Sequence, residues 1–279
     1  MGNTVILHIG FGHNGGMISD ALNDSHIDET VLVSLPPDFK NLKDNPALTE
    51  LEDSFRDNDV LCFKGARDYP LITMITVDLN EDVKHKDIMR LVNEIKRLYR
   101  QSLIIVAALI PDNDNRHKAL SMCREIENEE RVNALFDLDF MRVQDIKSYS
   151  EKISTFARQI NDFIEMTVAR GYIDIEQKMI TDLLMKKFEP NHLVCLSSAG
   201  TDINEIQDSL LQQMSAYNQR EVACLVDIVV GEKDLTIGEM FNIGELLLDS
   251  FACDYTWGVR RSNRLKGDER KINIFMNYG

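Results

Sequence analysis

The chain has 279 residues, of which 44% are hydrophobic, so it is long enough to form one large or two ordinary domains around a real core. Its 46 acidic and 31 basic residues give a net charge of −15, which argues against nucleic acid or an anionic membrane surface as the main partner. The five cysteines include no C-x-x-C pair, the start lacks a basic stretch, and the longest apolar run, Leu103 to Ile110, is too short to cross a bilayer, so we predict a reduced, cytoplasmic chain without direct membrane insertion.

The first element is a strand that leads through a glycine cluster into a helix. Val5 to Gly16 has the sequence V-I-L-H-I-G-F-G-H-N-G-G, and apolar residues follow at helical spacing from Met17. Glycines let the backbone approach a ligand closely, and the N–H groups of a helix start attract anions. The glycines also match the dinucleotide pattern G-x-G-x-x-G. Two interpretations stay open, an anion-binding loop and a turn that needs positive φ.

Strands and helices alternate through the rest of the first half. Strands are predicted at 30–35, 60–63, 71–77 and 103–110, and helices at 47–55 and from Val83 to about Leu98. The run at 103–110 is apolar throughout, which is typical of a strand buried on both faces of a parallel sheet. This alternation indicates an α/β domain.

A long amphipathic helix follows, and then the pattern changes. Apolar residues at steps of three and four predict a helix at 145–169, closed by Gly171. A second helical segment at 179–188 stops at Pro190. Beyond it we predict strands at 192–197, 221–230, 255–260 and 271–276, with a helix at 237–251. We place a domain boundary near Pro190, with a smaller α+β domain behind it.

The second half carries a family resemblance. The run from Cys224 is C-L-V-D-I-V-V-G-E-K-D-L-T-I-G-E-M, and it resembles the strand, G-G-x-D-L-T-L-x-E segment and helix of FtsZ, the bacterial and archaeal tubulin relative. The residues in register are Gly231, Asp234, Leu235, Thr236 and Glu239. Tyr255-Thr-Trp-Gly258 is similar to the I-I-W/F-G strand of that family, and 271–279 is similar to its closing strand.

The resemblance extends over essentially the whole chain. The long helix and the loop from Gly171 resemble the central helix and following loop of FtsZ, Asn45-Pro46 resembles its A-N-P turn, and 10–16 takes the place of its first nucleotide loop. It implies a tubulin/FtsZ-like α/β fold with an N-terminal Rossmann-like GTPase-type domain at 1–144, a central helix and connecting segment at 145–190, and a C-terminal α+β domain at 191–279. The positions that it implies for a vestigial nucleotide site are Gly10, Phe11, Gly12, His13, Asn14, Gly15, Asn45 and Ser150.

The chain departs from the family where the phosphates would bind. After the strand at 71–77, the family has G-G-G-T-G-T/S-G, whereas this chain has Asp78-Leu-Asn-Glu-Asp82. Carboxylates close to a triphosphate are unfavourable unless metals intervene. We hypothesise that the chain's own side chains take the anion site and that Asp82 or Asn80 caps the helix that begins near Val83. The expected self-capping residues are Asp78, Asn80, Glu81 and Asp82.

Base recognition and hydrolysis are changed as well. The acid that reads guanine in the family corresponds to Ser150 here. In the loop after the central helix, Tyr172 replaces an asparagine, Asp174 keeps the first aspartate, and Gln177 replaces the second, with Glu176 one residue away. The resemblance therefore implies that no catalytic residue remains, that GTPase activity is lost or very weak, and that no cofactor is expected.

Other candidate sites are weaker. The histidines form no H-E-x-x-H pattern, and the loop from Asp112 to His117 lacks the glycine and glutamate of a calcium loop, so no metal site is predicted. A nicotinamide dehydrogenase needs an acid at the end of the second strand to hold the ribose, and this chain has Ser34 and Leu35 there. The sequence therefore argues against a dehydrogenase.

Three functions are compatible with this sequence. The first is a divergent FtsZ-like structural or cytoskeletal protein that forms a homo-oligomer or filament, or binds another filament or division protein. The second is a GTP-binding and GTP-hydrolysing filament protein, with GTP or GDP and Mg²⁺ held by Asp78 and Asp82. The third is a nucleotide- or NAD-binding regulator that uses the turn at Gly10 alone.

Overall fold

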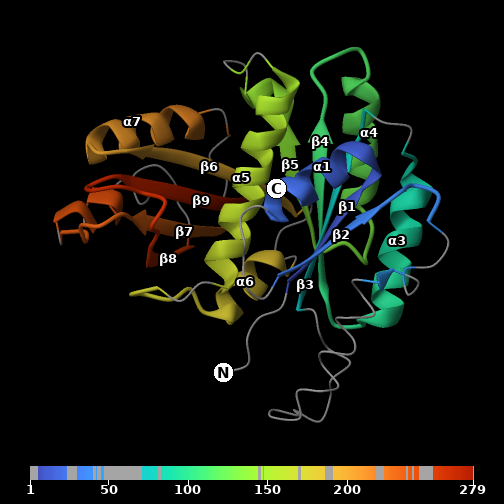
Figure 1. Ribbon diagram of the computed structural model, residues 1–279, viewed down its shortest axis with the longest axis horizontal. Helices are drawn as coiled ribbons and strands as arrows, with labels where there is room; N and C mark the ends of the chain where they lie inside the picture. Colours follow the sequence, from blue (N-terminus) through green and yellow to red (C-terminus); the bar gives the residue numbers. More distant parts are fainter. Residues whose placement is uncertain are drawn as a thin grey trace, which may run out of the picture. The chain divides into compact units, whose positions relative to one another are not determined.

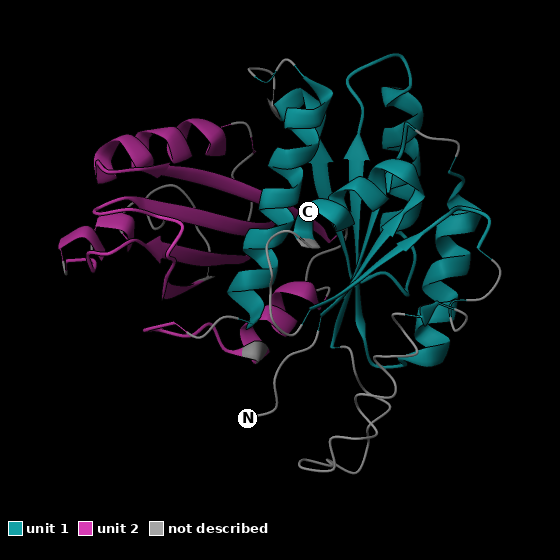
Figure 2. Ribbon diagram, in the orientation of Figure 1, with its two compact units in different colours: residues 1–168 teal, residues 169–279 magenta. Residues whose placement is uncertain are grey.

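The computed structural model describes most of the chain. The described residues are 6–23, 30–39, 42, 45–46, 71–80, 83–143, 146, 148–168, 171–185, 191–215, 217, 223–236, 238–240, 242–244 and 254–278. The predicted helix at 47–55, the predicted strand at 60–63, Glu81 and Asp82 lie outside them. The chain divides into two compact units, residues 1–168 (unit 1) and 169–279 (unit 2), coloured teal and magenta in Figure 2.

Unit 1 contains five parallel strands in the order β2-β1-β3-β4-β5 (Figure 1). The strands are β1 (Ile6–Phe11), β2 (Thr30–Leu35), β3 (Ile72–Asp78), β4 (Leu103–Ile110) and β5 (Ala134–Asp139). Every residue of β3 and β4 is buried, which confirms the expected strand covered on both faces. The sheet is the scaffold that holds the candidate site.

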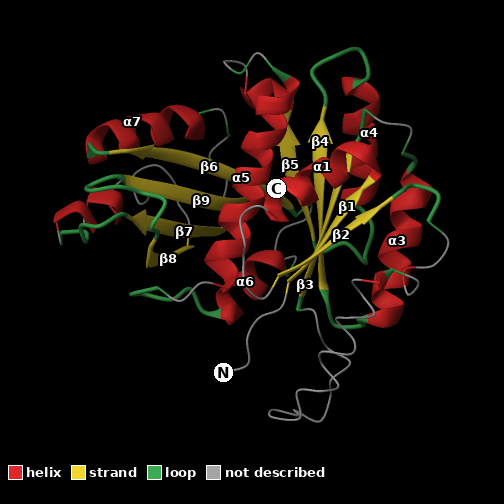
Figure 3. Cartoon of the chain, in the orientation of Figure 1, coloured by secondary structure: helices red, strands yellow, loops and turns green. Residues whose placement is uncertain are grey.

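Helices cover both faces of this sheet. They are α1 (Gly12–Asn23), α3 (His85–Leu98), α4 (Arg116–Glu127) and α5 (Tyr149–Val168), with a short 3-10 helix, η3 (Phe140–Val143), after β5 (Figure 3). Helix α1 packs against α5 on one face, and α3 contacts α4 on the other. The core beneath α3 and α4 includes Ile9, Val77 and Val106, which alternate with residues that face α1 and α5.

Unit 2 contains a mixed sheet in the order β6-β9-β7-β8. Strand β9 runs antiparallel to β6 and β7, and β7 runs parallel to β8. The elements are α6 (Gln177–Leu184), β6 (His192–Gly200), α7 (Ile203–Met214), β7 (Ala223–Val230), β8 (Asp254–Arg261) and β9 (Arg270–Tyr278). Apolar residues of α7 and of these strands form the core of the unit, with Leu210 and Ile274 fully buried.

The motif that carries the family resemblance has a structural explanation within unit 2. The backbone N–H and the hydroxyl of Thr236 donate to the Glu239 carboxylate at 2.6 and 2.8 Å, and the Glu239 N–H donates back to the Thr236 hydroxyl at 3.2 Å. This is a capping box, which satisfies the first N–H groups of a helix. Asp234 accepts a hydrogen bond from the Arg261 guanidinium at 2.6 Å. The motif therefore builds a helix start.

The predicted helix at 145–169 begins later than expected, and its predicted last residue, Ala169, lies outside the described residues. It begins at Tyr149 because Ser148 and Glu151 form a second capping box: the Glu151 N–H donates to the Ser148 hydroxyl at 3.2 Å and the Ser148 N–H donates to the Glu151 carboxylate at 3.4 Å. Helix α6 ends at Leu184, before the predicted 188. No helix among the described residues is long and apolar enough to cross a membrane.

Candidate functional site at the carboxyl edge of the parallel sheet

The strand order of unit 1 indicates where a ligand would bind. The chain passes from β1 to β2 on one side and then to β3 on the other, so the strand order reverses between β1 and β3. In open α/β sheets, ligands bind at such a switch point, outside the carboxyl ends of the strands. The residues at this position are the start of α1, which follows β1, and Asp78, which ends β3. We call this place the switch-point crevice.

The glycine cluster spans the end of β1 and the start of α1, and the positive φ expected for a tight turn is found at Gly12, where the strand passes into the helix. Helix α1 begins at Gly12, directly after Phe11, and Gly12 has a φ of 83°. A Cβ on Gly10 would lie 2.2 Å from the carbonyl oxygen of Gly15, and a Cβ on Gly15 would lie 2.4 Å from the carbonyl oxygen of Thr76. These two glycines are therefore required because α1 packs directly on β1 and β3.

Three side chains meet in the switch-point crevice. Asp78, which is 0% exposed, accepts hydrogen bonds on Oδ2 from Asn14 Nδ2 at 2.6 Å and from the Tyr149 hydroxyl at 2.7 Å. Asn14 Nδ2 also donates to the Tyr149 hydroxyl at 2.6 Å. Oδ1 of Asp78 accepts from the Asn80 N–H at 2.8 Å. The partners of this buried carboxyl among the described residues are thus neutral groups from α1, α5 and the loop after β3.

Asn80 joins the crevice to the neighbouring loop and does not cap α3. Its Oδ1 accepts hydrogen bonds from Asn113 Nδ2 at 3.2 Å and from Asn115 Nδ2 at 2.9 Å, both in the loop after β4. Helix α3 begins at His85 with Lys84 as N-cap, two residues later than the predicted start. The capping role predicted for Asn80 is therefore wrong, because the Asn113 and Asn115 amides take its side-chain oxygen.

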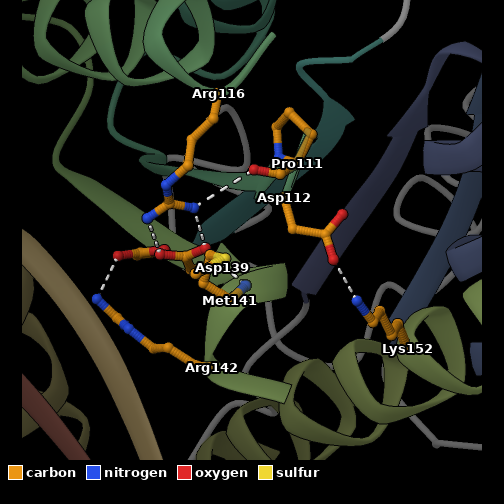
Figure 4. A network of polar contacts seen from close by, with 8 residues as sticks. Pro111, Asp112, Arg116, Asp139, Met141, Arg142 and Lys152 are labelled. Atoms are coloured by element: carbon orange, nitrogen blue, oxygen red, sulfur yellow. Dashed lines mark hydrogen bonds and ion pairs between the residues drawn. The ribbon is translucent and has the colours of Figure 1, made fainter. Parts of the chain in front are cut away.

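The first two turns of α5 hold the other side of the crevice. Lys152 donates to Asp112 Oδ2 at 2.5 Å, and this contact lowers the pKa of the Asp112 carboxyl (Figure 4). The Lys152 ammonium also lies 5.4 Å from the centre of the Phe140 ring, and Phe140 packs edge-to-face on Tyr149 at 5.3 Å. Helix α5 is therefore fixed to the ends of β3, β4 and β5.

An ion pair organises the end of β5 beside this site. Arg116 donates to both carboxylate oxygens of Asp139, at 2.5 and 2.7 Å, and to the carbonyl of Pro111 at 3.4 Å (Figure 4). The carboxylate raises the pKa of the guanidinium. Because both oxygens of Asp139 are engaged by the guanidinium, this pair positions η3 and the Phe140 ring.

His8 is a buried polar residue beneath α1. Its Nδ1 lies 2.9 Å from the Ser19 hydroxyl and its Nε2 lies 2.9 Å from the Thr76 hydroxyl. Since Ser19 donates its own hydrogen to the carbonyl of Val33 at 3.4 Å, Nδ1 carries the imidazole hydrogen and Nε2 accepts from Thr76. Burial lowers the pKa of His8 to about 3, so the ring is neutral.

The structure brings together only part of the predicted site. Asn14, Asp78 and Asn80 meet, whereas His13 and Ser150 are exposed and Asn45 is half-buried, with its N–H bonded to the Leu42 carbonyl at 3.2 Å. Sequence reasoning missed Tyr149, although it lies directly before Ser150 at the start of the predicted central helix. Among the described residues no group of three metal-ligating side chains gathers, and the Asp82 of the proposed Mg²⁺ pair lies outside them.

The residues of the predicted hydrolysis loop belong to unit 2. Asp174 accepts a hydrogen bond from the Gly171 N–H at 2.6 Å, which shapes the loop. The exposed Tyr172 ring lies under the Arg261 guanidinium, 5.5 Å away. Glu176 is the N-cap residue of α6, and its side chain caps nothing. The side chain of Gln177 lies outside the described residues.

Solved structures share this arrangement of strands and helices. An FtsZ dimer from M. jannaschii, described as empty, superposes with a TM-score of 0.71 at 11% identity, covering 99% of this chain and 89% of the other. The chain has a tubulin/FtsZ-like fold. Other neighbours with this fold are CetZ from Methanosaeta thermophila (TM-score 0.65, 14% identity, 98% of this chain and 86% of the other) and GDP-form protofilaments of TubZ from Bacillus thuringiensis serovar israelensis (0.65, 10%, 99% and 87%).

These likenesses are structural. No protein-family model and no curated protein matches the sequence. At 10–14% identity the tubulin/FtsZ-like fold is shared while most side chains differ, so the function of this chain has to be argued from its own residues.

Proposed function

We propose that this chain is a cytoplasmic structural protein of the tubulin/FtsZ-like fold that assembles without GTP. Its partner is a second copy of itself, in a homo-oligomer or filament, or another filament or division protein. The single observation that carries the proposal is the contact of the buried Asp78 side chain with Asn14 and Tyr149 in the switch-point crevice. The TubZ neighbour is described as a protofilament and the FtsZ neighbour as a dimer, which supports self-assembly as the use of this fold.

The residues of the crevice fit a triphosphate poorly. Phosphate binding needs free donors at the helix start, and here the Asn14 amide in the first turn of α1 is bonded to the Asp78 carboxylate. A phosphate near Asp78 would face a buried carboxylate whose partners are neutral. The chain's own polar groups make the contacts there, so we propose that this protein does not hydrolyse nucleotide there.

Nucleotide binding and assembly are tested separately. Protein purified without added nucleotide is denatured, and its supernatant is analysed by chromatography for GTP, GDP and NAD. Thermal unfolding is then measured with each compound, because a ligand at 100 times its Kd stabilises by about 2.7 kcal/mol. We expect no nucleotide in the supernatant and no shift. Bound guanine nucleotide would favour a GTP-dependent filament, and bound NAD would favour a regulator.

Assembly is followed by negative-stain microscopy and light scattering with and without GTP. We expect the same polymer or oligomer in both conditions. If the protein alone stays monomeric at high concentration, self-assembly is excluded, and binding to another filament protein is the function that stays proposed. Assembly that requires GTP would contradict the proposal as a whole.

A further inference from the structure

Tyr149 differs from the other members of the crevice in its accessibility. Asp78 is 0% exposed and is part of the central strand β3, and Phe140 is buried at the end of β5. Tyr149 is 41% exposed and is the first residue of α5. Helix ends fray more easily than helix interiors, so Tyr149 is the member that leaves the crevice at the lowest cost.

The neighbouring residues contact the oxygen, the hydrogen and the ring of the Tyr149 phenol. Asn14 donates to the hydroxyl oxygen at 2.6 Å, and Asp78 accepts the hydroxyl hydrogen at 2.7 Å. The Phe140 ring, held against Phe156 at 5.1 Å, provides an edge-to-face wall for the tyrosine ring. A donor, an acceptor and an aromatic wall together define a site for an aromatic hydroxyl group.

Side-chain contacts form a closed circuit around this site. From Asp78 the circuit passes to Asn80, then to Asn113 and Asn115, and through the same loop to Asp112. Asp112 contacts Lys152, which lies one helical turn after Tyr149, and Tyr149 returns to Asp78. Because these loops are tied to one another, the crevice keeps its shape when a single link is removed.

We propose that the switch-point crevice is a binding site for a phenol group and that Tyr149 is its built-in, removable ligand. In the closed state the side chain of Tyr149 fills the site and straps α5 to the end of β3. When the Tyr149 side chain moves out at the helix end, Asn14, Asp78 and Phe140 remain as a site that selects a neutral aromatic hydroxyl over an anion. This inference rests on the proposed function, in which the crevice is closed without nucleotide. It adds that a phenol group, from Tyr149 or from a ligand, occupies the crevice.

Chemical rescue tests this site. The Tyr149→Ala variant removes the ring and keeps the backbone, and its thermal unfolding is titrated with phenol in nucleotide-free buffer. We expect a saturable rise in Tm of about 2 °C or more at ten times the Kd of phenol. Benzene has the ring without the hydroxyl and should give a much smaller rise. Wild type and Tyr149→Phe, whose crevices are filled, should not respond to phenol.

The contrary outcomes are specific. Equal shifts in all three proteins would mean that phenol binds elsewhere, and equal shifts by benzene and phenol in Tyr149→Ala would mean an apolar cavity without hydroxyl recognition. Either result overturns the proposal. Adding Asn14→Ala to the Tyr149→Ala variant should abolish the phenol effect, and a retained effect would contradict the assigned donor.

Hydrogen exchange provides a second test if Tyr149→Ala does not fold. Tyr149→Phe keeps the ring and removes only the hydroxyl, and we expect at least about tenfold faster exchange in the second turn of α1, where the N–H groups first bond within the helix, because the link from α5 to Asn14 is lost. Tyr172→Phe in unit 2 is the matched control and should leave α1 unchanged. Unchanged exchange in Tyr149→Phe would overturn the strap. GTP binding by the wild type would contradict the proposed function and would leave both phenol results as they are.

Discussion

Two buried aspartates, one in each unit, differ in the charge of their hydrogen-bond partners. Asp227 on β7 accepts two hydrogen bonds from the Arg260 guanidinium, at 2.9 and 3.0 Å, and one from Asn273 Nδ2 at 3.0 Å, and all three residues are buried. Asp78 on β3 is buried as deeply, and its partners among the described residues are an amide, a phenol and a backbone N–H. One carboxylate is neutralised by an ion pair and the other is not.

The difference separates a structural site from a candidate functional one. The Asp227 network lies across β7, β8 and β9, and Ser197 on β6 donates to Asn273 at 2.8 Å, so it ties the sheet of unit 2 together. A buried carboxyl without a cationic partner is costly, and such groups occur where a protein handles a ligand or a conformational change. Asp78 also lies at the switch point, whereas Asp227 lies within a sheet.

The same substitution at both aspartates gives the largest expected contrast. Asp227→Asn leaves the buried Arg260 without its counter-charge and should destabilise unit 2 by about 3–5 kcal/mol. Asp78→Asn keeps one acceptor oxygen and leaves no buried counter-charge unpaired, so it should cost about 1 kcal/mol. Urea unfolding measures both, with fluorescence of Trp257, the single tryptophan, reporting on unit 2. Similar losses at the two positions would remove the distinction between them.

Two glycines of α1 test whether the cluster serves packing. Gly10→Ala places a Cβ 2.2 Å from the backbone of Gly15 and should cost about 1–3 kcal/mol or more, because α1 must move off the sheet. Gly16→Ala is the matched control, since its nearest neighbour is the Ser34 hydroxyl at 3.6 Å, and it should stabilise by about 0.4–1 kcal/mol. Urea unfolding followed by circular dichroism measures the pair. A tolerated Gly10→Ala would contradict the packing role.

His8 makes unit 1 sensitive to acid. Its pKa is lowered to about 3 in the folded state, so between pH 6.5 and 3 the unfolded chain binds a proton that the folded chain does not. Stability is therefore full above pH 6.5 and falls as the pH decreases, by about 1.4 kcal/mol per unit. The stability difference between wild type and His8→Gln should shrink by about 2 kcal/mol from pH 7 to pH 5. A constant difference over this range would show that His8 protonates normally.

Substitutions in the two capping boxes should have the smallest effect on stability, and they form a matched pair, one in each unit. Ser148→Ala at the start of α5 and Thr236→Ala in unit 2 should each cost about 1 kcal/mol. Only Ser148→Ala should also speed hydrogen exchange in the second turn of α1, because it loosens the helix end that carries Tyr149. Faster α1 exchange in Thr236→Ala would mean that the effect is not specific to α5.

The sequence predicted the fold better than the site. Apolar runs placed β3 and β4 to within one residue, because a strand buried on both faces has few alternatives, and β2 was placed by its β-branched residues before Pro36. The tubulin/FtsZ-like fold is confirmed by the solved structures. Helices α4 and α7 and strand β5 were not predicted. Strand β5 was missed because Asp137 and Asp139 break its apolar pattern, and their charges are balanced by Arg142 and Arg116.

The site was harder because it depends on residues that are distant in sequence. Asn14, Asp78 and Tyr149 are separated by at least 64 positions along the chain, and each is unremarkable in its own segment. Counting along the central helix led to Ser150, and the neighbouring tyrosine fills the crevice instead. The expected cap at Asn80 was wrong for the same reason, since its partners lie in a loop 33 and 35 residues away.

The contact between Gly10, Gly15 and Thr76 also bears on how such a protein diverges. Selection for folding alone would retain these glycines, since a side chain at either position pushes α1 off the sheet. Selection for nucleotide binding is not needed to keep them, so a glycine-rich pattern would persist in descendants long after the ligand is gone.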